Sequence, residues 1–377
     1  MKNAVLLTSL LSLGHDVVAF GRTRTPWRST NDTQTWPSLN DTQPCTFTGS
    51  TGYSLLKASN RSCTDIVLSD LSVPAGVTLD LRNLRNGASV TFQGETSWGY
   101  SEWAGPLVSI SGTNITVKGA PGSLLNGSGD LYWDGEGQGG KTKPKFFQAR
   151  LIDSTISDIS ILNAPVHVFS INNSRNLKIA NVIIDNLAGD GLAKNTDGFD
   201  ISQSSNIEIE GATVMNQDDC VAINSGSNIV FRDGICIGGH GLSVGSIGGR
   251  SDNTVDNVLF DNSVIINSQN GIRIKTKHST NGTVSNVAYR NIGLSYITDY
   301  GIVVDQSYGA KTLAPTNGVS ITNFTLENVS GTMMGDGLAI FVRCGEGSCA
   351  DWTWAGVNVV GGQRSTECTG LPAGIEC

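Results

Sequence analysis

Three aspartates and a histidine are the residues in this sequence best suited to catalysis. Asp197 lies in an Asn-Thr-Asp-Gly-Phe-Asp run, and Asp218 and Asp219 follow in a Gln-Asp-Asp-Cys run. His240 comes next along the chain, between two glycines. Carboxyl groups held close together raise one another's proton affinity, so such a group can provide both a general acid and a general base.

The spacing of these residues predicts that they lie side by side. The interval from Asp197 to Asp218 equals the interval from Asp219 to His240. A structural repeat of similar length would stack them in one column. For any single aspartate, a place in a turn is the simpler explanation. That explanation does not account for all of these residues together, because stacked carboxylates repel one another and reduce stability unless one is protonated.

Two basic residues further on can bind an acidic ligand. Arg273 and Lys275 are two positions apart, so on a strand they point to the same face. An arginine forms directional paired hydrogen bonds with a carboxylate, and a lysine adds a point charge.

A repeat in the sequence supplies the elements that must position these groups. Segments of the form Asn followed by alternating apolar residues begin at Asn176, Asn206, Asn228, Asn257 and Asn286. Short strands that recur every roughly 22 to 30 residues, with no room for crossover helices, predict an all-β parallel β-helix. No leucine-asparagine consensus recurs, and a propeller blade is longer, so both of those repeat folds are disfavoured. A short helix from Tyr53 to Ala58 is expected to cap the N-terminal end.

The two ends of the chain and its overall charge limit the classes of function. Residues 1–20 are expected to form a signal peptide and residues 21–44 a pro-segment, which leaves 45–377 as a single β-helix domain. No apolar run is long enough to span a bilayer. The net charge of -8 and pI near 5.0 argue against a nucleic-acid partner.

Eight cysteines agree with export from the cell. Their close spacing favours pairing between neighbours, although eight cysteines allow about 105 connectivities. The chain has only four histidines and no Cys-x-x-Cys motif, so nothing suggests a zinc site. Sequons at Asn60, Asn281 and Asn323 are compatible with glycosylation.

Taken together, the Asn-Thr-Asp, Gln-Asp-Asp, Gly-His-Gly and Arg-Ile-Lys motifs resemble the polygalacturonases of glycoside hydrolase family 28, above all the fungal endo-acting enzymes. The likeness extends from about Cys45 to Cys377 and includes a Trp-Ala-Gly-Pro-Leu run at Trp103. It implies a right-handed parallel β-helix and hydrolysis of α-1,4-linked galacturonic acid in pectin, with no cofactor or metal. It also implies four neighbouring disulfides, namely Cys45–Cys63, Cys220–Cys236, Cys344–Cys349 and Cys368–Cys377.

The resemblance implies a role for each matching residue. Asp218 matches the general acid, Asp197 and Asp219 match the carboxylates that activate water, and His240 matches a histidine that helps set the protonation of the acid. The residues expected to bind and orient substrate are Asn195, Arg273, Lys275 and Tyr308.

Two observations complicate the match. A coil spacing of about 4.8 Å brings the carboxylates close together, which by the general separation rule indicates a retaining enzyme, whereas the family inverts. We expect inversion. The run Asp305-Gln306-Ser307-Tyr308 and the residue Gln269 also depart from the motifs of the fungal enzymes, which puts the subsites beside the cleavage point in question.

Other functions remain open from the sequence. Exo-polygalacturonase and xylogalacturonan hydrolase belong to the same family. A pectate lyase would use calcium on the stacked aspartates, and a non-catalytic pectin-binding β-helix would have lost turnover. The expected partner is pectin or polygalacturonate, with no nucleic acid and no membrane, and the protein is expected to be a secreted monomer.

Overall fold

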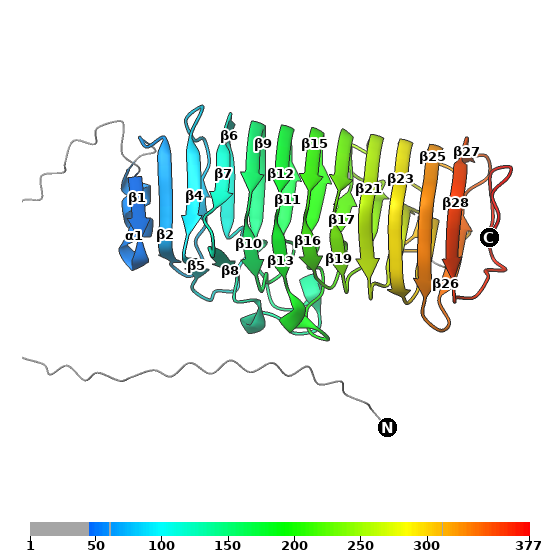
Figure 1. Ribbon diagram of the computed structural model, residues 1–377, viewed down its shortest axis with the longest axis horizontal. Coiled ribbons are helices and arrows are strands. Elements are labelled where there is room, and N and C mark those ends of the chain that lie inside the picture. Colours follow the sequence, from blue (N-terminus) through cyan, green and yellow to red (C-terminus); the bar gives the residue numbers. More distant parts are fainter. Residues whose placement is uncertain (1–44, 60–61, 311) are drawn as a thin grey trace, which may run out of the picture. The chain divides into compact units, whose positions relative to one another are not determined.

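The computed structural model describes residues 45–377 apart from 60, 61 and 311, and this part of the chain consists mainly of short parallel strands. It contains 28 strands and one α-helix, α1 (Gly49–Ala58). Successive coils stack along one axis in sequence order, as the colours in Figure 1 show. The prediction of a right-handed parallel β-helix is confirmed.

The strands form three columns in which each strand pairs with its counterpart one coil away. The first column contains β1 (Cys45–Thr48), β2 (Asp65–Val73), β4 (Ser89–Gln93), β7 (Thr116–Gly119), β9 (Phe147–Ser157), β12 (Arg175–Ala180), β15 (Ser204–Glu210), β18 (Gly226–Arg232), β21 (Thr254–Ile266), β23 (Gly282–Ile297), β25 (Val319–Met333), β27 (Cys349–Ala350) and β28 (Thr353–Val360). The second column adds β5 (Glu95–Trp98), β8 (Leu124–Asn126), β10 (Ser160–Leu162), β13 (Ile183–Asp185), β16 (Thr213–Met215) and β19 (Ile235–Ile237), and it continues through the later parts of the long strands.

The third column carries the candidate site. Besides the first half of β9, it contains β3 (Leu79–Leu81), β6 (Val108–Thr113), β11 (Phe169–Asn172), β14 (Phe199–Ser202), β17 (Val221–Ile223), β20 (Leu242–Ile247), β22 (Asn270–Lys277), β24 (Tyr300–Tyr308) and β26 (Leu338–Arg343). Short 3-10 turns lie outside the columns at Gly129–Leu131, Gly137–Gly139 and Leu187–Gly189.

Like side chains stack on like inside the coils because the parallel register repeats at every turn. Phe169 pairs with Phe147 and with Phe199, and the ring centroids of these neighbours lie 5.0 and 5.2 Å apart. Phe260 and Tyr289 stack in the same way at 4.4 Å. Such aromatic pairs bury large apolar areas and lock the stagger of one coil on the next.

Four of the asparagines that open the sequence repeats, Asn176, Asn206, Asn228 and Asn257, form a hydrogen-bonded ladder along the exposed side of the first column, whereas Asn286 donates to Asp256. Asn176, Asn206, Asn228, Asn257 and Asn286 all have left-handed backbone conformations, with φ between 52° and 55°. The side-chain amide of Asn228 donates to Asn206 at 2.9 Å and accepts from Asn257 at 2.7 Å. Asparagine suits this position because it tolerates positive φ and can bond to the same residue type one coil away.

The N-terminal end is capped as the sequence predicts, although the helix starts earlier. Helix α1 begins at Gly49 rather than at Tyr53, and it buries Gly52 and Leu56. The difference arises because Gly49 to Gly52 carry no apolar pattern, yet they complete the first turn beside β1 and β2. The Cys45–Cys63 disulfide ties the cap to the first coils.

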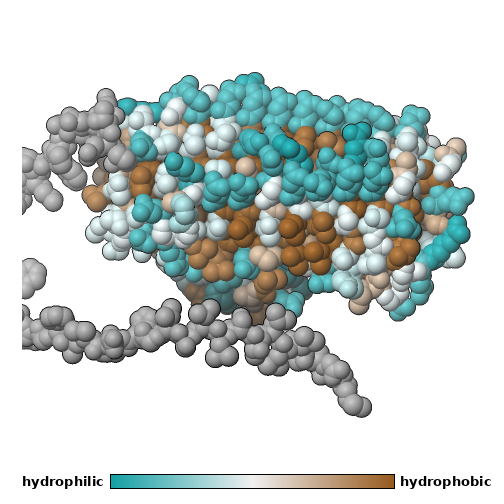
Figure 2. Space-filling model, in the orientation of Figure 1, coloured by the Kyte–Doolittle hydropathy of each residue, from teal (hydrophilic) through white to brown (hydrophobic). Residues whose placement is uncertain are grey.

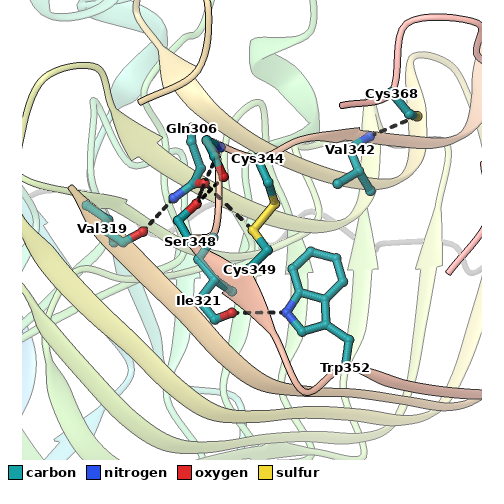
Figure 3. Close-up of a disulfide and its surroundings, with 10 residues drawn as sticks. Gln306, Val319, Ile321, Val342, Cys344, Ser348, Cys349, Trp352 and Cys368 are labelled. Atoms are coloured by element: carbon teal, nitrogen blue, oxygen red, sulfur yellow. Dashed lines mark hydrogen bonds between the residues drawn. A yellow bond between two sulfur atoms is a disulfide. The ribbon is translucent and has the colours of Figure 1, made fainter. Parts of the chain in front are cut away.

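All four predicted disulfides are present, and no free cysteine remains among the eight. Near the C-terminal end, the Cys344–Cys349 loop is held by the buried side chain of Gln306 (Figure 3). The Gln306 amide donates to the Val319 carbonyl at 2.6 Å, and its oxygen accepts from Ser348 Oγ at 2.6 Å and from the Gly345 N–H at 2.8 Å.

Figure 2 shows polar surface over the first column and a more hydrophobic area over the second. Ile183, Ile235 and Val264 of the second column are 45%, 42% and 41% exposed. None of the helices that the structure describes is long and apolar enough to cross a membrane. The predicted signal peptide, pro-segment and Asn60 sequon lie outside the described residues.

The ladder predicts that Asn228→Ala destabilises the fold more than Asn228→Gly. Both variants lose the amide bonds, but only alanine is strained at positive φ, which costs about 1–2 kcal/mol. Urea unfolding measures the difference, with Ser227→Ala on the same strand as the control, expected within about 0.5 kcal/mol of wild type. Equal losses for alanine and glycine would show that the backbone conformation is not the reason.

Candidate active site

The predicted catalytic residues come from the turns that precede three successive strands of the third column. Asp197 lies two residues before β14, the Asp218–Asp219 pair lies just before β17, and His240 lies two residues before β20. Arg273 and Lys275 lie on β22, and Tyr308 ends β24. The structure therefore brings the sequence-predicted residues together on one column, with the aspartates and His240 before the strands, the two cations within β22 and Tyr308 at the end of β24.

The register differs in one detail from the predicted spacing. Strand β14 pairs with β17 so that Phe199 is level with Val221. Asp197 is therefore level with Asp219, whose carbonyl accepts the Gly198 N–H at 2.8 Å. The predicted stacking of Asp197 on Asp218 is wrong by one position, because this coil is longer by one residue than the interval between those two aspartates.

The glycines on either side of His240 are required by close backbone packing. A Cβ at Gly239 would lie 2.1 Å from the Asp218 carbonyl oxygen, and one at Gly241 would lie 2.2 Å from the Gly271 carbonyl oxygen. The His240 N–H donates to the Asp218 carbonyl at 2.8 Å. These contacts fix the histidine above the aspartate.

Asp218 is a partly buried carboxylate with three hydrogen-bond donors. Its Oδ1 contacts His240 Nδ1 at 2.9 Å and accepts the Asp219 N–H at 2.8 Å, while its Oδ2 accepts from the Asn195 amide at 3.2 Å. Burial raises the pKa of Asp218. The hydrogen bond and charge of His240, the charge of Lys275 and the Asp219 N–H together outweigh burial, so the pKa lies below its usual range.

Asp219 is almost completely buried and is neutralised by two cations. Its Oδ2 accepts from Lys275 Nζ at 2.6 Å, and its Oδ1 binds the Arg273 guanidinium and the Ser243 hydroxyl, the latter at 2.7 Å. Ser243 also accepts from Arg273 Nε at 2.9 Å. A buried carboxylate of this kind is tolerated because its charge is paired and its oxygens are hydrogen-bonded.

Asp197 has the opposite electrostatic environment. Burial, followed by the charges of Asp200, Asp218 and Asp219, raises the pKa of Asp197 well above its usual value, and Lys275 offsets only part of this. Burial and the clustered carboxylates therefore favour the protonated form of Asp197.

His167, Asp200, Gln138 and Ser243 also belong to the site, although they were not predicted from the sequence. His167 Nδ1 bonds to Asp200, and its Nε2 lies 3.9 Å from Asp197 Oδ1 and contacts the Gln138 amide. Strand β11 pairs with β14 so that His167 is level with Asp197. The interval between the first two asparagine repeats is the same as that between His167 and Asp197, and this was the signal that could have identified the histidine.

The second group of missed residues holds the turn that carries the aspartates. The Thr196 hydroxyl donates to Gln217 Oε1 at 3.0 Å, and the buried Asn216 amide donates to the carbonyls of Thr196 and Asp219 at 2.8 and 3.0 Å. The Cys220–Cys236 disulfide ties the residue after Asp219 to β19. Hydrogen bonds and a covalent link therefore both fix the carboxylates.

A pocket of about 290 Å³ opens beside the carboxylates along β22, β24 and β26. Arg273, Lys275 and Tyr308 line it, and Lys275 Nζ lies 5.2 Å from the centre of the Tyr308 ring. Gln269 and Asp305, which depart from the fungal motifs, line it as well. The departures from the family pattern therefore fall where a substrate would bind.

Among the residues that the structure describes, two carboxylate–histidine groups could contact a metal ion by distance alone, namely Asp218 with Asp219 and His240, and Asp197 with His167 and Asp200. In the first, both Asp219 oxygens already bind cationic side chains. In the second, His167 Nδ1 is taken up by Asp200. Both Asp219 oxygens and His167 Nδ1 are thus already bound to protein groups.

Comparisons with known proteins find relatives that match most of the chain. The family model for glycosyl hydrolases family 28 matches residues 63–377. The chain is 56% identical over 348 residues to a probable endopolygalacturonase E of Aspergillus niger, covering 90% of this chain and 92% of that protein. It is 55% identical over 336 residues to endopolygalacturonase I of Aspergillus aculeatus, covering 88% and 89%.

A solved structure shows the same fold. Endopolygalacturonase I from Stereum purpureum, complexed with two galacturonate, superimposes with a TM-score of 0.76 at 32% identity, covering 85% of this chain and 95% of that one.

The disulfide beside Asp219 predicts a link between stability and turnover. Replacing Cys220 and Cys236 by alanine is expected to lower Tm, since a loop of about 15 residues gains about 3 kcal/mol from such a bridge. It should also lower kcat, because the turn that carries Asp218 and Asp219 is released. Removing the Cys45–Cys63 bridge is the matched control and should lower Tm alone. Wild-type kcat in the first variant would contradict the coupling, as would free thiols at both positions.

Proposed function

The chain belongs to glycosyl hydrolase family 28, and from this premise we propose that it is an endo-polygalacturonase that hydrolyses α-1,4 linkages between galacturonic acid residues of pectin. The observation that carries the proposal is the group of Asp197, Asp218 and Asp219 beside Arg273 and Lys275. Carboxyl groups supply the acid and base that glycoside hydrolysis needs, and the adjacent cations match an acidic sugar.

Asp218 acts as the general acid in this proposal. It is the carboxyl group that His240 contacts directly, at 2.9 Å, and Asn195 orients its other oxygen. In the free protein the pKa of Asp218 is lowered, so Asp218 must take up a proton when substrate binds. A uronate bound next to Lys275 raises the pKa of Asp218, because its negative charge offsets the lysine charge that lowers this pKa.

Asp197 and Asp219 position and deprotonate the attacking water, which leads to inversion at the anomeric carbon. Asp219 is held rigidly by Ser243, Arg273 and Lys275, so its orientation does not depend on substrate. Asp197 lies level with it one coil away and has a raised pKa, so in this proposal Asp197 and Asp218 share one proton. Activity therefore depends on which of these two carboxyls carries that proton.

The uronate to be cleaved binds through Arg273, Lys275 and Tyr308. In the free protein both cations point to Asp219, so the substrate carboxylate shares them rather than meeting isolated charges. A net-negative protein has no long-range attraction for a polyanion, and local contacts must select the substrate. We expect a secreted monomer that uses no cofactor.

The alternative functions give different products. An exo-acting enzyme releases only monomer or dimer from polygalacturonate, whereas endo action gives mixed oligomers and a fast fall in viscosity. A calcium-dependent lyase gives an unsaturated product that absorbs ultraviolet light, and its activity is sensitive to EDTA. A binding protein gives no product. Product sizing over time, with and without EDTA, separates all of these.

The acid assignment predicts different behaviour for Asp218→Asn and Asp197→Asn. Asp218→Asn should keep the fold but lose nearly all turnover at every pH, because an amide cannot deliver the proton. In Asp197→Asn, residual activity should be lost at lower pH than in wild type, because in the active form, with the proton on Asp218, the ionised Asp197 that raises the proton affinity of Asp218 is missing. Profiles of kcat/KM against pH measure both effects. More than a few per cent activity in Asp218→Asn would assign the acid to another residue.

The substrate-binding assignment predicts the effect of charge on the substrate. Methyl esterification removes the uronate charge, so activity should fall as the esterification of pectin rises. Lys275→Ala should raise KM on polygalacturonate and weaken the preference for it over esterified pectin. Steady-state kinetics on both substrates test this. Unchanged KM in the variant, together with equal cutting of esterified pectin by wild type, would refute the assignment.

A further inference from the structure

The pocket beside the carboxylates has two halves of different chemistry. The inner half is formed by Arg273, Lys275 and Tyr308. The remainder, here called the outer half, is lined by residues from the following coils, namely Asp299, Tyr300, Asp305, Phe341, Arg343 and Glu367. Both halves lie on the same column of strands, so a sugar chain that runs along the column passes from one to the other.

Strand register places the two halves one after another. Lys275 of β22 pairs with Asp305 of β24, which pairs with Arg343 of β26. Arg273 pairs in the same way with Val303 and then Phe341. The positive row beside the catalytic carboxylates is therefore replaced, about 4.8 Å further along, by an aspartate and an apolar residue.

The outer half carries excess negative charge. Three carboxylates, on Asp299, Asp305 and Glu367, face one guanidinium, on Arg343, and that guanidinium also donates to the Leu313 carbonyl. The pKa of the Tyr300 phenol reflects the same negative charges. Burial raises its pKa, as do Asp299, Asp305 and Glu367, while Arg343 lowers it. A free uronate placed here would meet net repulsion.

The same half offers an apolar platform. The rings of Tyr300 and Phe341 stack with centroids 5.2 Å apart and an interplanar angle of 29°. Aromatic walls with a few polar groups are the usual lining of small-molecule sites, and they favour an uncharged face of a ligand.

The walls are rigid before any ligand arrives. Gln306, between Asp305 and Ser307, is fully buried and holds the Cys344–Cys349 loop (Figure 3). Asp305 Oδ1 accepts from the N–H and the hydroxyl of Ser307 at 2.9 and 2.8 Å. The carboxylate of Asp305 therefore cannot turn away to relieve repulsion from a bound uronate.

We propose that the outer half of the pocket is a subsite for a methyl-esterified galacturonate, adjacent to the free galacturonate held by Arg273 and Lys275. This inference rests on the proposed function. It makes the enzyme selective for a pattern of esterification, with a free acid at the inner half and an ester at the next sugar, while dense esterification still abolishes binding at the inner half.

The test is the ratio of kcat/KM on pectin of intermediate esterification to kcat/KM on polygalacturonate. In the double variant Asp299→Asn/Glu367→Gln, polygalacturonate should be cut more efficiently, and the ratio should fall by about two- to fivefold, as expected for exposed charges. Asp305→Asn keeps the acceptor for Ser307 and should shift the ratio in the same direction. The matched control is Asp351→Asn, an exposed aspartate of the C-terminal coils outside the pocket, whose φ of 58° asparagine tolerates.

Mass-spectrometric sequencing of the pectin oligomers gives a second readout. In wild-type products, esters should be enriched at the second sugar from the cut on one side and absent from the first, and the enrichment should decrease in the variants. An unchanged ratio in folded, active variants, or a random ester position at the second sugar, would overturn the subsite. Failure of the wild-type protein to cut polygalacturonate would instead overturn the proposed function.

Discussion

Parallel hydrogen bonding between coils is the constraint on which this structure depends. It holds each strand about 4.8 Å from its counterpart and repeats the same register, so whatever stands at one position meets its equivalent one coil away. In the interior this stacks Phe169 between Phe147 and Phe199. On the turns it builds the asparagine ladder around Asn228. At one edge of the third column it holds carboxylates close together, and the repulsion between them reduces the stability of the fold.

The carboxylate group persists because the same register also supplies cations. Asp219 is buried and lies against Arg273 and Lys275, which come from a strand two coils further on. The negative charge of Asp218 is stabilised by His240, whereas Asp197 has no direct cationic partner and retains a raised pKa. The aligned residues thus include one carboxyl group with a raised pKa and one with a lowered pKa, which is the property that acid–base hydrolysis requires.

The register also explains the change of chemistry along the pocket. Each coil contributes one row of outward side chains, so a single substitution alters the environment of about one sugar. Of the departures from the fungal motifs, Gln269 lies on the coil that carries the cations and Asp305 on the next coil. They leave the carboxylate group intact and alter the neighbouring surface. Substrate selection can therefore vary from coil to coil while the catalytic coils keep their geometry.

The sequence by itself determined the fold class, the presence of a capping helix and the column of the fold where Asp197, Asp218, Asp219, His240, Arg273, Lys275 and Tyr308 meet, and the close spacing of the cysteines favoured pairing between neighbours. These features are encoded locally, by repeats, turns and short motifs. Only the tertiary structure decided that Asp197 is level with Asp219, that both cations bind Asp219, and that His167 and Ser243 belong to the site. The reason is that successive coils differ in length, as the pairings of Phe169 with Phe199, Phe199 with Val221 and Val221 with Leu242 show. The side chains that face one another therefore depend on the register of each coil pair and not on a fixed period.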